Sequence, residues 1–236
     1  FDEFGNYLWH YDVTGHAMQE VLEKELGKHG TYRGVALTTG SAGTIGCGDY
    51  LKQVFPTSKV AASEALQCPT LYENGFGAHR IEGIGDKHVP WIHNVKNTDM
   101  VIAIDDEAVV SLARLFNEPA GRAYLAKQGV PPEFIEKLDL MGFSGISNVL
   151  SAIKMAKYYE LGEQDIVLTV LTDSMELYAS RLREMLREAP RPAQTPRLSC
   201  SPSRTPGSAR CRAGRPRRAR PGPTSGPGTR PRAPPR

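Results

Sequence analysis

The chain has 236 residues, 29 basic and 26 acidic side chains, and a formal net charge of +3. The charge is uneven, because residues 191–236 hold 12 Arg and 11 of the 18 Pro but no acidic residue. The preceding 190 residues carry 17 basic and 26 acidic groups, a net charge of −9. A body of that length suits one sizeable core or two small ones, at roughly 100–200 residues per domain.

Several classes of protein are excluded by composition. No stretch approaches the ~18 apolar residues of a membrane-spanning helix. The four Cys form no CxxC pair and no metal-ligand spacing with His, so neither a disulfide scaffold nor a metal site is expected. The first residues, Phe1–Phe4, do not resemble a signal peptide, and we expect a cytoplasmic protein. Because the sequence has no initiator Met, we expect it to begin after processing or inside a longer sequence.

The Arg- and Pro-rich tail, assigned to residues 189–236, is predicted to be disordered, because Pro blocks regular hydrogen bonding and Leu198 is its single large apolar side chain. One interpretation is a basic arm that displaces counterions from nucleic acid. The other is a non-native extension, favoured because no aromatic side chain is interleaved for base stacking. Nucleic acid is therefore an unlikely partner.

Residues 1–188 read as alternating helices and strands. Thr14 is expected to cap a helix with apolar positions from Met18 to Leu26, and a strand through residues 35–37 leads into a helix at 45–55. Strands are expected at 59–63 and 100–104, and acidic residues at 105–107 suit a helix's first turn.

The second half repeats this order. A helix follows Ser144 and Gly145, a continuous apolar strand is expected at 165–171, and Asp173 or Ser174 caps a last helix. Strand–helix units at this spacing predict an α/β fold of three layers, a mostly parallel sheet with helices on both faces.

Three segments carry candidate chemistry. The small residues at 40–44, between a strand and a helix, suit either a backbone cradle for a phosphate monoester or a tight strand–helix junction. Gly83-Ile84-Gly85 permits close backbone approach to a ligand; Asp86 and His88, which follow, are suited to proton transfer, or the segment is an ordinary loop. Residues 171–176 mark the end of a buried strand, where ligands gather in open α/β sheets. We find no ordered set of nucleophile, base and acid.

In this order the segments resemble the pyridoxal-phosphate enzymes of the cysteine synthase and cystathionine β-synthase group, the tryptophan-synthase-β-like fold type II. The resemblance covers Phe1 to about Arg187. The matching segments are His10–Gly15, Gly40–Thr44, Lys59–Glu64, His79–Gly85, Gly142–Gly145 and Leu171–Ser174, with Tyr178 and Ser180.

The resemblance implies roles for individual residues. The cofactor, pyridoxal 5′-phosphate, would be bound through its phosphate by Gly40, Ser41, Ala42, Gly43 and Thr44. Gly83, Ile84 and Gly85 would line the substrate site. Ser174 or Asp173 would face the pyridine nitrogen; we favour Ser174, whose neutral hydroxyl leaves that nitrogen unprotonated.

The sequence also departs from the family. Ala42 stands where the family has its central Gly, Asp86-Lys87-His88 replaces small and aromatic residues, and the stretch 116–140 is longer than usual. No Lys occupies the Schiff-base position, which the family places upstream of the segment matched by Phe1. The lysines considered are Lys24, Lys28, Lys52, Lys59, Lys87 and Lys96.

The resemblance therefore implies a C-terminal fragment of a lyase or transferase that performs β-elimination or β-replacement on a small amino acid. It names no catalytic residue in this chain, predicts no turnover from it alone, and implies a homodimer for the complete protein. The alternatives are a non-catalytic anion-binding α/β module, and a Rossmann-like nucleotide-binding domain with a basic nucleic-acid-binding tail.

Overall fold

The computed structural model describes residues 2–27 and 30–188 of the chain. The predicted disorder of residues 189–236, and with it the proposed domain boundary at 188/189, concerns residues outside that description. No helix in the described ranges is long and apolar enough to cross a membrane.

The body is built on a parallel sheet of β1 (Thr31–Thr38), β2 (Lys59–Ala65), β3 (Met100–Ile104) and β4 (Asp165–Leu168) in the order β3-β2-β1-β4. Alternate residues of β1 point to opposite faces. Val35 and Leu37 pack toward α2 (Gly15–Glu25) and α3 (Ile45–Val54), whereas Ala36 belongs to the core on the other face.

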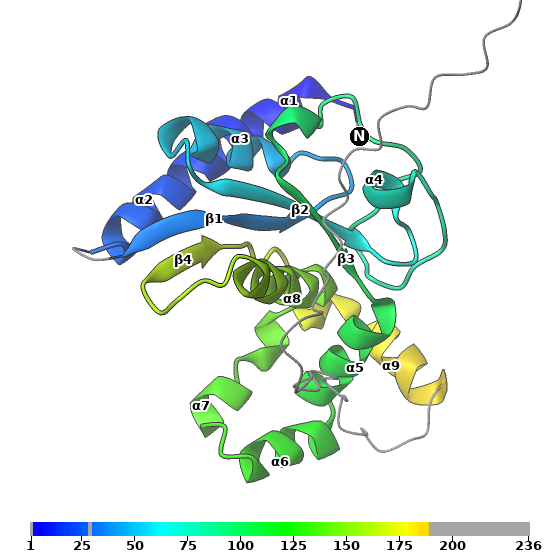
Figure 1. Cartoon of the computed structure of the whole chain (residues 1–236). Helices are drawn as coiled ribbons and strands as arrows, with labels where there is room; N and C mark the ends of the chain where they lie inside the picture. Colours follow the sequence, from blue (N-terminus) through cyan, green and yellow to red (C-terminus); the bar gives the residue numbers. More distant parts are fainter. Residues whose placement is uncertain (1, 28–29, 189–236) are drawn as a thin grey trace, which may run out of the picture. The chain divides into compact units, whose positions relative to one another are not determined.

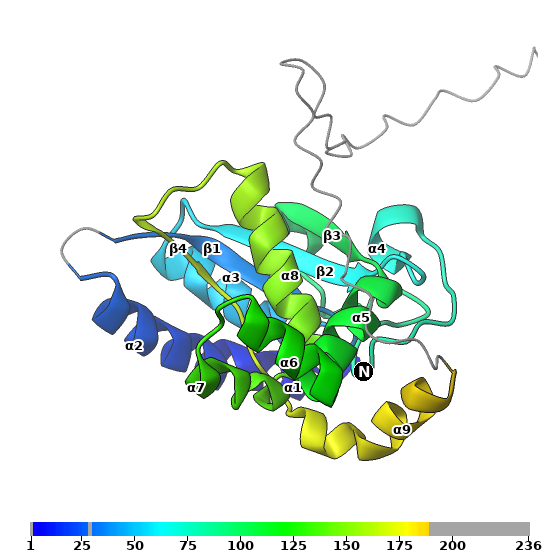
Figure 2. The same cartoon turned by 90° about the horizontal axis from the view of Figure 1, so that it is seen from below.

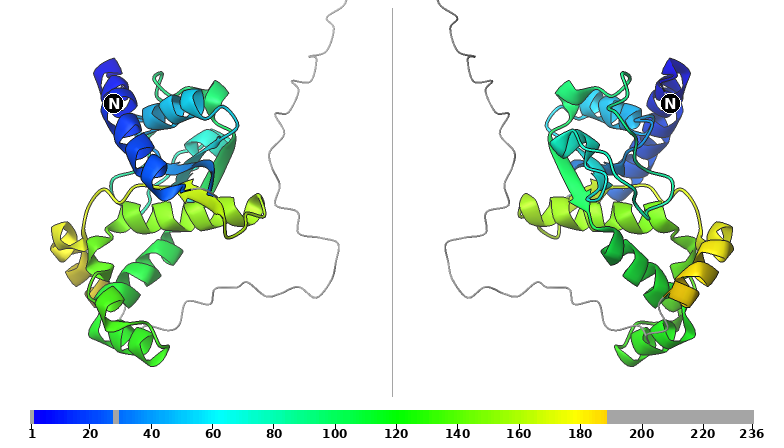
Figure 3. Two further views of the ribbon diagram at one scale, coloured as in Figure 1. Left: turned by 90° about the vertical axis from the view of Figure 1, so that its left-hand side faces the viewer. Right: turned by 90° about the vertical axis from the view of Figure 1, so that its right-hand side faces the viewer.

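Helices cover both faces of this sheet. Helices α1 (Phe4–Trp9), α2 and α3 lie on one side, and α8 (Phe143–Tyr158) runs across the other (Figures 1, 2 and 3). Small residues face α8: Ser63 of β2 hydrogen-bonds Ser151 of α8 at 2.6 Å, with both side chains fully buried. The predicted three-layer α/β fold is confirmed.

The remaining elements connect these layers. They are the π-helical turn η1 (His10–Thr14), α4 (Thr70–Glu73), η2 (Val95–Asn97), α5 (Asp106–Asn117), α6 (Pro119–Lys127), α7 (Pro132–Ile135), η3 (Leu138–Leu140), η4 (Met175–Tyr178) and α9 (Ala179–Glu188). The long stretch 116–140 forms α6, α7 and η3.

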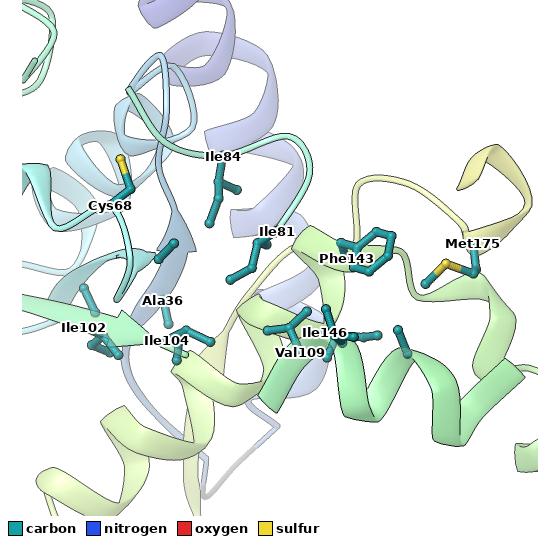
Figure 4. Packing of buried hydrophobic residues seen from close by; sticks show 14 of the residues in the cluster. Ala36, Cys68, Ile81, Ile84, Ile102, Ile104, Val109, Phe143, Ile146 and Met175 are labelled. Atoms are coloured by element: carbon teal, nitrogen blue, oxygen red, sulfur yellow. The ribbon is translucent and has the colours of Figure 1, made fainter. Parts of the chain in front are cut away.

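One core cluster joins the α8 face of the sheet to the loop that holds Ile81 and Ile84 (Figure 4). Phe143 and Met175 lie in the same cluster and are at most 1% exposed. The loop at residues 81–85 and the start of α8 are therefore held by apolar burial, which is the main stabilising force in such a core.

Several local expectations were wrong. Thr14 does not begin a helix, because α1, η1 and α2 follow one another without a break, and its hydroxyl bonds His10 at 2.9 Å. The last strand ends at Leu168, because hydrogen bonds of the Asn148 and Thr169 side chains redirect the chain after it. This strand is half-buried and lies at the edge of the sheet. The expected cap position is right, since Ser174 is the N-cap residue of the 3-10 turn η4 that precedes α9, but its side chain makes no capping hydrogen bond.

The chain order of the strands creates a switch point. From β1 the chain crosses by α3 to β2 on one side, while β4 lies on β1's other side and is reached by way of α5 and α8. Loops that leave neighbouring parallel strands in opposite directions open a crevice at the strands' carboxyl ends. Residues 39–44 and 169–174 follow the carboxyl ends of β1 and β4, the two strands at this switch point.

Candidate functional site

The loop at residues 39–44 joins β1 to the first turn of α3. That turn is closed by hydrogen bonds from Gly46 N to Gly43 O (2.9 Å) and from Cys47 N to Thr44 O (3.2 Å). Among the described residues, no backbone acceptor is recorded for the amides of residues 40–45. Unpaired amides at a helix N-terminus are suited to bind an anion.

Two neighbours dictate the small residues of this loop. A Cβ on Gly40 would lie 3.2 Å from both the backbone N and O of Gly85, and a Cβ on Gly43 would overlap the side chain of Asn6. Ala42 has φ 62°, a left-handed conformation that favours glycine. The segment is thus a tight junction that also leaves amides available, so the two sequence interpretations are compatible.

The Gly83-Ile84-Gly85 turn lies directly against the loop. Gly83 and Gly85 have φ of 83° and 88°, and Gly85 N donates to Thr39 O at 3.0 Å. Ile84 is buried between them in the core. The structure therefore brings these three residues, expected to line a substrate site, beside the loop expected to bind phosphate.

Asn148, fully buried in α8, connects the loop to the segment after β4. Its Oδ1 accepts from Thr38 N at 2.7 Å, and its Nδ2 donates to Val170 O at 2.8 Å. Thr169 Oγ1 donates to Ala36 O at 2.7 Å. The chain that carries Asp173 and Ser174 is therefore fastened along β1.

Asp173 and Ser174 differ in their engagement. Asp173 Oδ1 accepts from Ser144 at 3.0 Å and Thr172 at 3.1 Å, and Oδ2 accepts from the Tyr178 hydroxyl. Burial, followed by the hydrogen bond to Asp173, raises the pKa of Tyr178. Ser174 O accepts from Leu177 N, and its hydroxyl makes no capping hydrogen bond.

A small cavity adjoins Thr39 and Gly40 and is also lined by Glu64, Asp86 and His88. Buried Oδ2 of Asp86 and Oγ1 of Thr39 have no hydrogen-bond partner among the described residues. Burial raises the pKa of Glu64, although its carboxylate accepts from Leu71 N at 2.8 Å and Tyr72 N at 2.9 Å. The cavity thus presents oxygen atoms next to the loop.

Two of the lysines considered for a Schiff base, Lys52 and Lys59, lie away from the candidate site. Lys52 and Lys59 bind Asp99 at 2.5 and 3.3 Å, beside the amino ends of β2 and β3. These amino ends lie at the opposite end of the sheet from the candidate site, because β2 and β3 run parallel to β1 and the site follows the carboxyl end of β1. The Lys87 ammonium lies 5.9 Å from the centre of the Phe76 ring. No cluster of potential metal ligands is found in the described ranges.

Sequence reasoning missed Asn6 and Asn148. Asn6 Nδ2 donates to Ser41 Oγ at 3.1 Å across 35 residues of sequence. Each is a lone Asn inside a helix, where the local pattern gives no hint of a long-range partner. The larger amide of Asn148 among the small residues of α8, such as Ser144 and Ser151, is the sequence feature that marks one of them.

The site and topology define a class: an α/β protein with a candidate anion-binding loop at the switch point of a parallel sheet. No family model matches the chain. Among curated proteins, it is similar to cysteine synthase B of Campylobacter jejuni, 31% identical over 142 residues, covering 60% of this chain and 40% of that protein. It is also similar to a cysteine synthase of Staphylococcus aureus, 27% identical over 181 residues, covering 76% of this chain and 51% of that protein.

Solved structures agree. A hydrogen sulfide-producing enzyme from Fusobacterium nucleatum superposes with a TM-score of 0.59 at 26% identity, covering 78% of this chain and 49% of that one. An O-acetylserine-dependent cystathionine β-synthase from Helicobacter pylori gives a TM-score of 0.54 at 26% identity, covering 74% and 49%.

These likenesses confirm the resemblance seen in the sequence: the chain is similar to cysteine synthases and cystathionine β-synthases, and it shares the fold of the solved structures that it matches. It spans about half the length of the curated relatives it matches.

Proposed function

We propose that this chain forms the phosphate-anchoring part of a pyridoxal-phosphate enzyme that eliminates or replaces a group on the β-carbon of a small amino acid, such as serine, acetylserine or cysteine. The observation that carries the proposal is the loop at 40–44, with amides free of backbone acceptors, at the switch point beside β4. The cysteine synthase and cystathionine β-synthase relatives support this reaction class.

The loop at 40–44 and the turn at 83–85 have separate roles. Gly40, Ser41, Ala42, Gly43 and Thr44 hold the phosphate of pyridoxal 5′-phosphate through amides and hydroxyls. Gly83, Ile84 and Gly85 line the substrate side. When bound, the cofactor stabilises negative charge at the substrate α-carbon.

Ser174 is the residue that would meet the pyridine nitrogen of a bound cofactor. The support is the contrast with its neighbour, because the Asp173 carboxylate already accepts three hydrogen bonds from Ser144, Thr172 and Tyr178. The Ser174 hydroxyl makes no capping hydrogen bond, so it is available to the ring.

We further propose that the described part of this chain binds the cofactor without turning over substrate. Lys52 and Lys59 are engaged at the opposite edge of the sheet. A Schiff base requires a Lys held over the cofactor. The complete protein is proposed to be a cytoplasmic homodimer that supplies that Lys.

Calorimetric titration of the chain with pyridoxal phosphate, pyridoxal and inorganic phosphate tests the anchoring role. We expect pyridoxal phosphate to bind, inorganic phosphate to compete with it, and pyridoxal to bind at least tenfold more weakly. Equal affinity for pyridoxal and its phosphate would remove the anchoring role.

The other functions give different results. Binding of inorganic phosphate without preference for the ring compound indicates an anion-binding module. Salt-sensitive nucleic-acid binding that disappears when residues 191–236 are deleted indicates the nucleic-acid alternative. A borohydride-reducible Lys adduct together with β-elimination would overturn the absence of turnover.

A further inference from the structure

Helix α1 lies on the first turn of α3, beside the candidate phosphate loop (Figure 1). Two glycines allow the approach: a Cβ on Gly43 would overlap Asn6, and a Cβ on Gly46 would lie 2.7 Å from Tyr7 O. The side chain of Asn6 therefore lies against the loop at Gly43.

Asn6 controls the direction of the Ser41 hydroxyl. Its Nδ2 donates to Ser41 Oγ at 3.1 Å, so one lone pair of that oxygen is occupied. A hydroxyl has one proton to donate and two lone pairs. Because the amide donates, the Ser41 proton stays available for another acceptor at the loop.

We propose that Asn6 is a positioning residue for anion binding, which holds Ser41 as a hydrogen-bond donor to the bound phosphate. The inference rests on the proposed function of the loop and adds a residue from a different element. Asn6 acts through Ser41, so it contributes by orientation.

Other contacts keep α1 in place when Asn6 is changed. Tyr7 Oη donates to Asp49 at 2.8 Å, and the ring of Phe4 stacks on Tyr7 and on Trp91. Variants at Asn6 are therefore expected to keep the helix docked, which separates an effect on the loop from an effect on folding.

Substitution of Asn6 by Asp tests the proposal with almost no change of shape. The carboxylate accepts hydrogen bonds only, so it takes the Ser41 proton and adds negative charge beside the anion. We expect inorganic phosphate to bind at least tenfold more weakly to Asn6→Asp, and about threefold more weakly to Asn6→Ala. Gln164→Glu, which adds the same charge in the exposed loop before β4, is the control and should bind as the wild type does.

A double-mutant cycle isolates the route of action. In a Ser41→Ala background, Asn6→Ala should weaken phosphate binding no further, because the oriented group is gone. Additive losses, or wild-type affinity in Asn6→Asp with an unchanged melting temperature, would overturn the proposal while leaving the loop's function intact. Failure of the wild-type chain to bind inorganic phosphate would overturn both.

Discussion

Asn148 Oδ1 accepts a 2.7 Å hydrogen bond from Thr38 N, at the last residue of β1. The other end of the same amide holds Val170 O at 2.8 Å, so one fully buried side chain fixes the strand before the loop and the segment leading to Ser174. An amide is the side chain that donates at one end and accepts at the other.

Replacing Asn148 with Leu, which has a similar volume, should destabilise the protein by about 2–4 kcal/mol. The change leaves two partly buried backbone groups, Thr38 N and Val170 O, without these partners, each costing about 1–3 kcal/mol. Urea denaturation at neutral pH measures the loss. Asn117→Leu, in the last turn of α5, is the control and should cost less than about 1 kcal/mol. Equal stability of the two variants would contradict the bridging role.

The sheet was predictable from the apolar runs within its strands: residues 100–104 form β3 as expected, and 59–63 lie within β2. The length of the edge strand β4 was overestimated, because an apolar sequence alone does not tell where long-range hydrogen bonds turn the chain. The junctions at 40–44 and 83–85 were predictable from their glycines. Their contact through Gly85 and Thr39 joins residues 46 positions apart, and no local pattern contains it.

The left-handed backbone at Ala42 predicts an asymmetric response to substitution. Ala42→Gly relieves a conformation that costs an L-residue about 1–2 kcal/mol, but it loses a buried methyl and gains chain entropy on unfolding. We expect its stability to stay within about 1 kcal/mol of wild type.

Ala42→Val should instead lose about 2–4 kcal/mol, because a β-branched residue at positive φ is strained and the site is fully buried. Thermal unfolding and phosphate titration of both variants check this. A valine variant as stable as the glycine variant would show that the loop does not hold this conformation.

Asp173 and Ser174 should separate stability from ligand binding. Asp173→Ala removes the acceptor of Ser144, Thr172 and Tyr178, and we expect a loss of about 1–3 kcal/mol. Ser174→Ala should change stability by less than about 0.5 kcal/mol, since its hydroxyl makes no capping bond.

Ser174, which should matter little for stability, should matter for ligand binding. Ser174→Ala should weaken binding of pyridoxal phosphate several-fold and leave binding of inorganic phosphate unchanged, because the hydroxyl is proposed to meet only the ring. Calorimetry with both ligands distinguishes the effects. A parallel loss of affinity for both ligands would place Ser174 at the phosphate instead.

Asp99 should make stability depend on acid. Burial by itself would raise the pKa of Asp99, but hydrogen bonds from Lys52, Val60 N and Lys59 outweigh it and lower the pKa below its ordinary value. A carboxyl whose pKa is lowered by folding contributes stability above its unfolded pKa, near 4, and that contribution is lost as pH falls through the folded value.

Asp99→Asn should therefore cost about 1–2 kcal/mol at pH 7, where the ionised carboxylate binds both ammonium groups. Below about pH 4 the difference between variant and wild type should shrink, because the wild-type carboxyl is then increasingly protonated in both states. Urea denaturation at pH 7 and at steps below pH 4 measures both, with Glu163→Gln, an exposed carboxylate, as the control. A difference that stays constant across this range would mean that Asp99 acts as a neutral hydrogen-bond acceptor and that its charge contributes nothing.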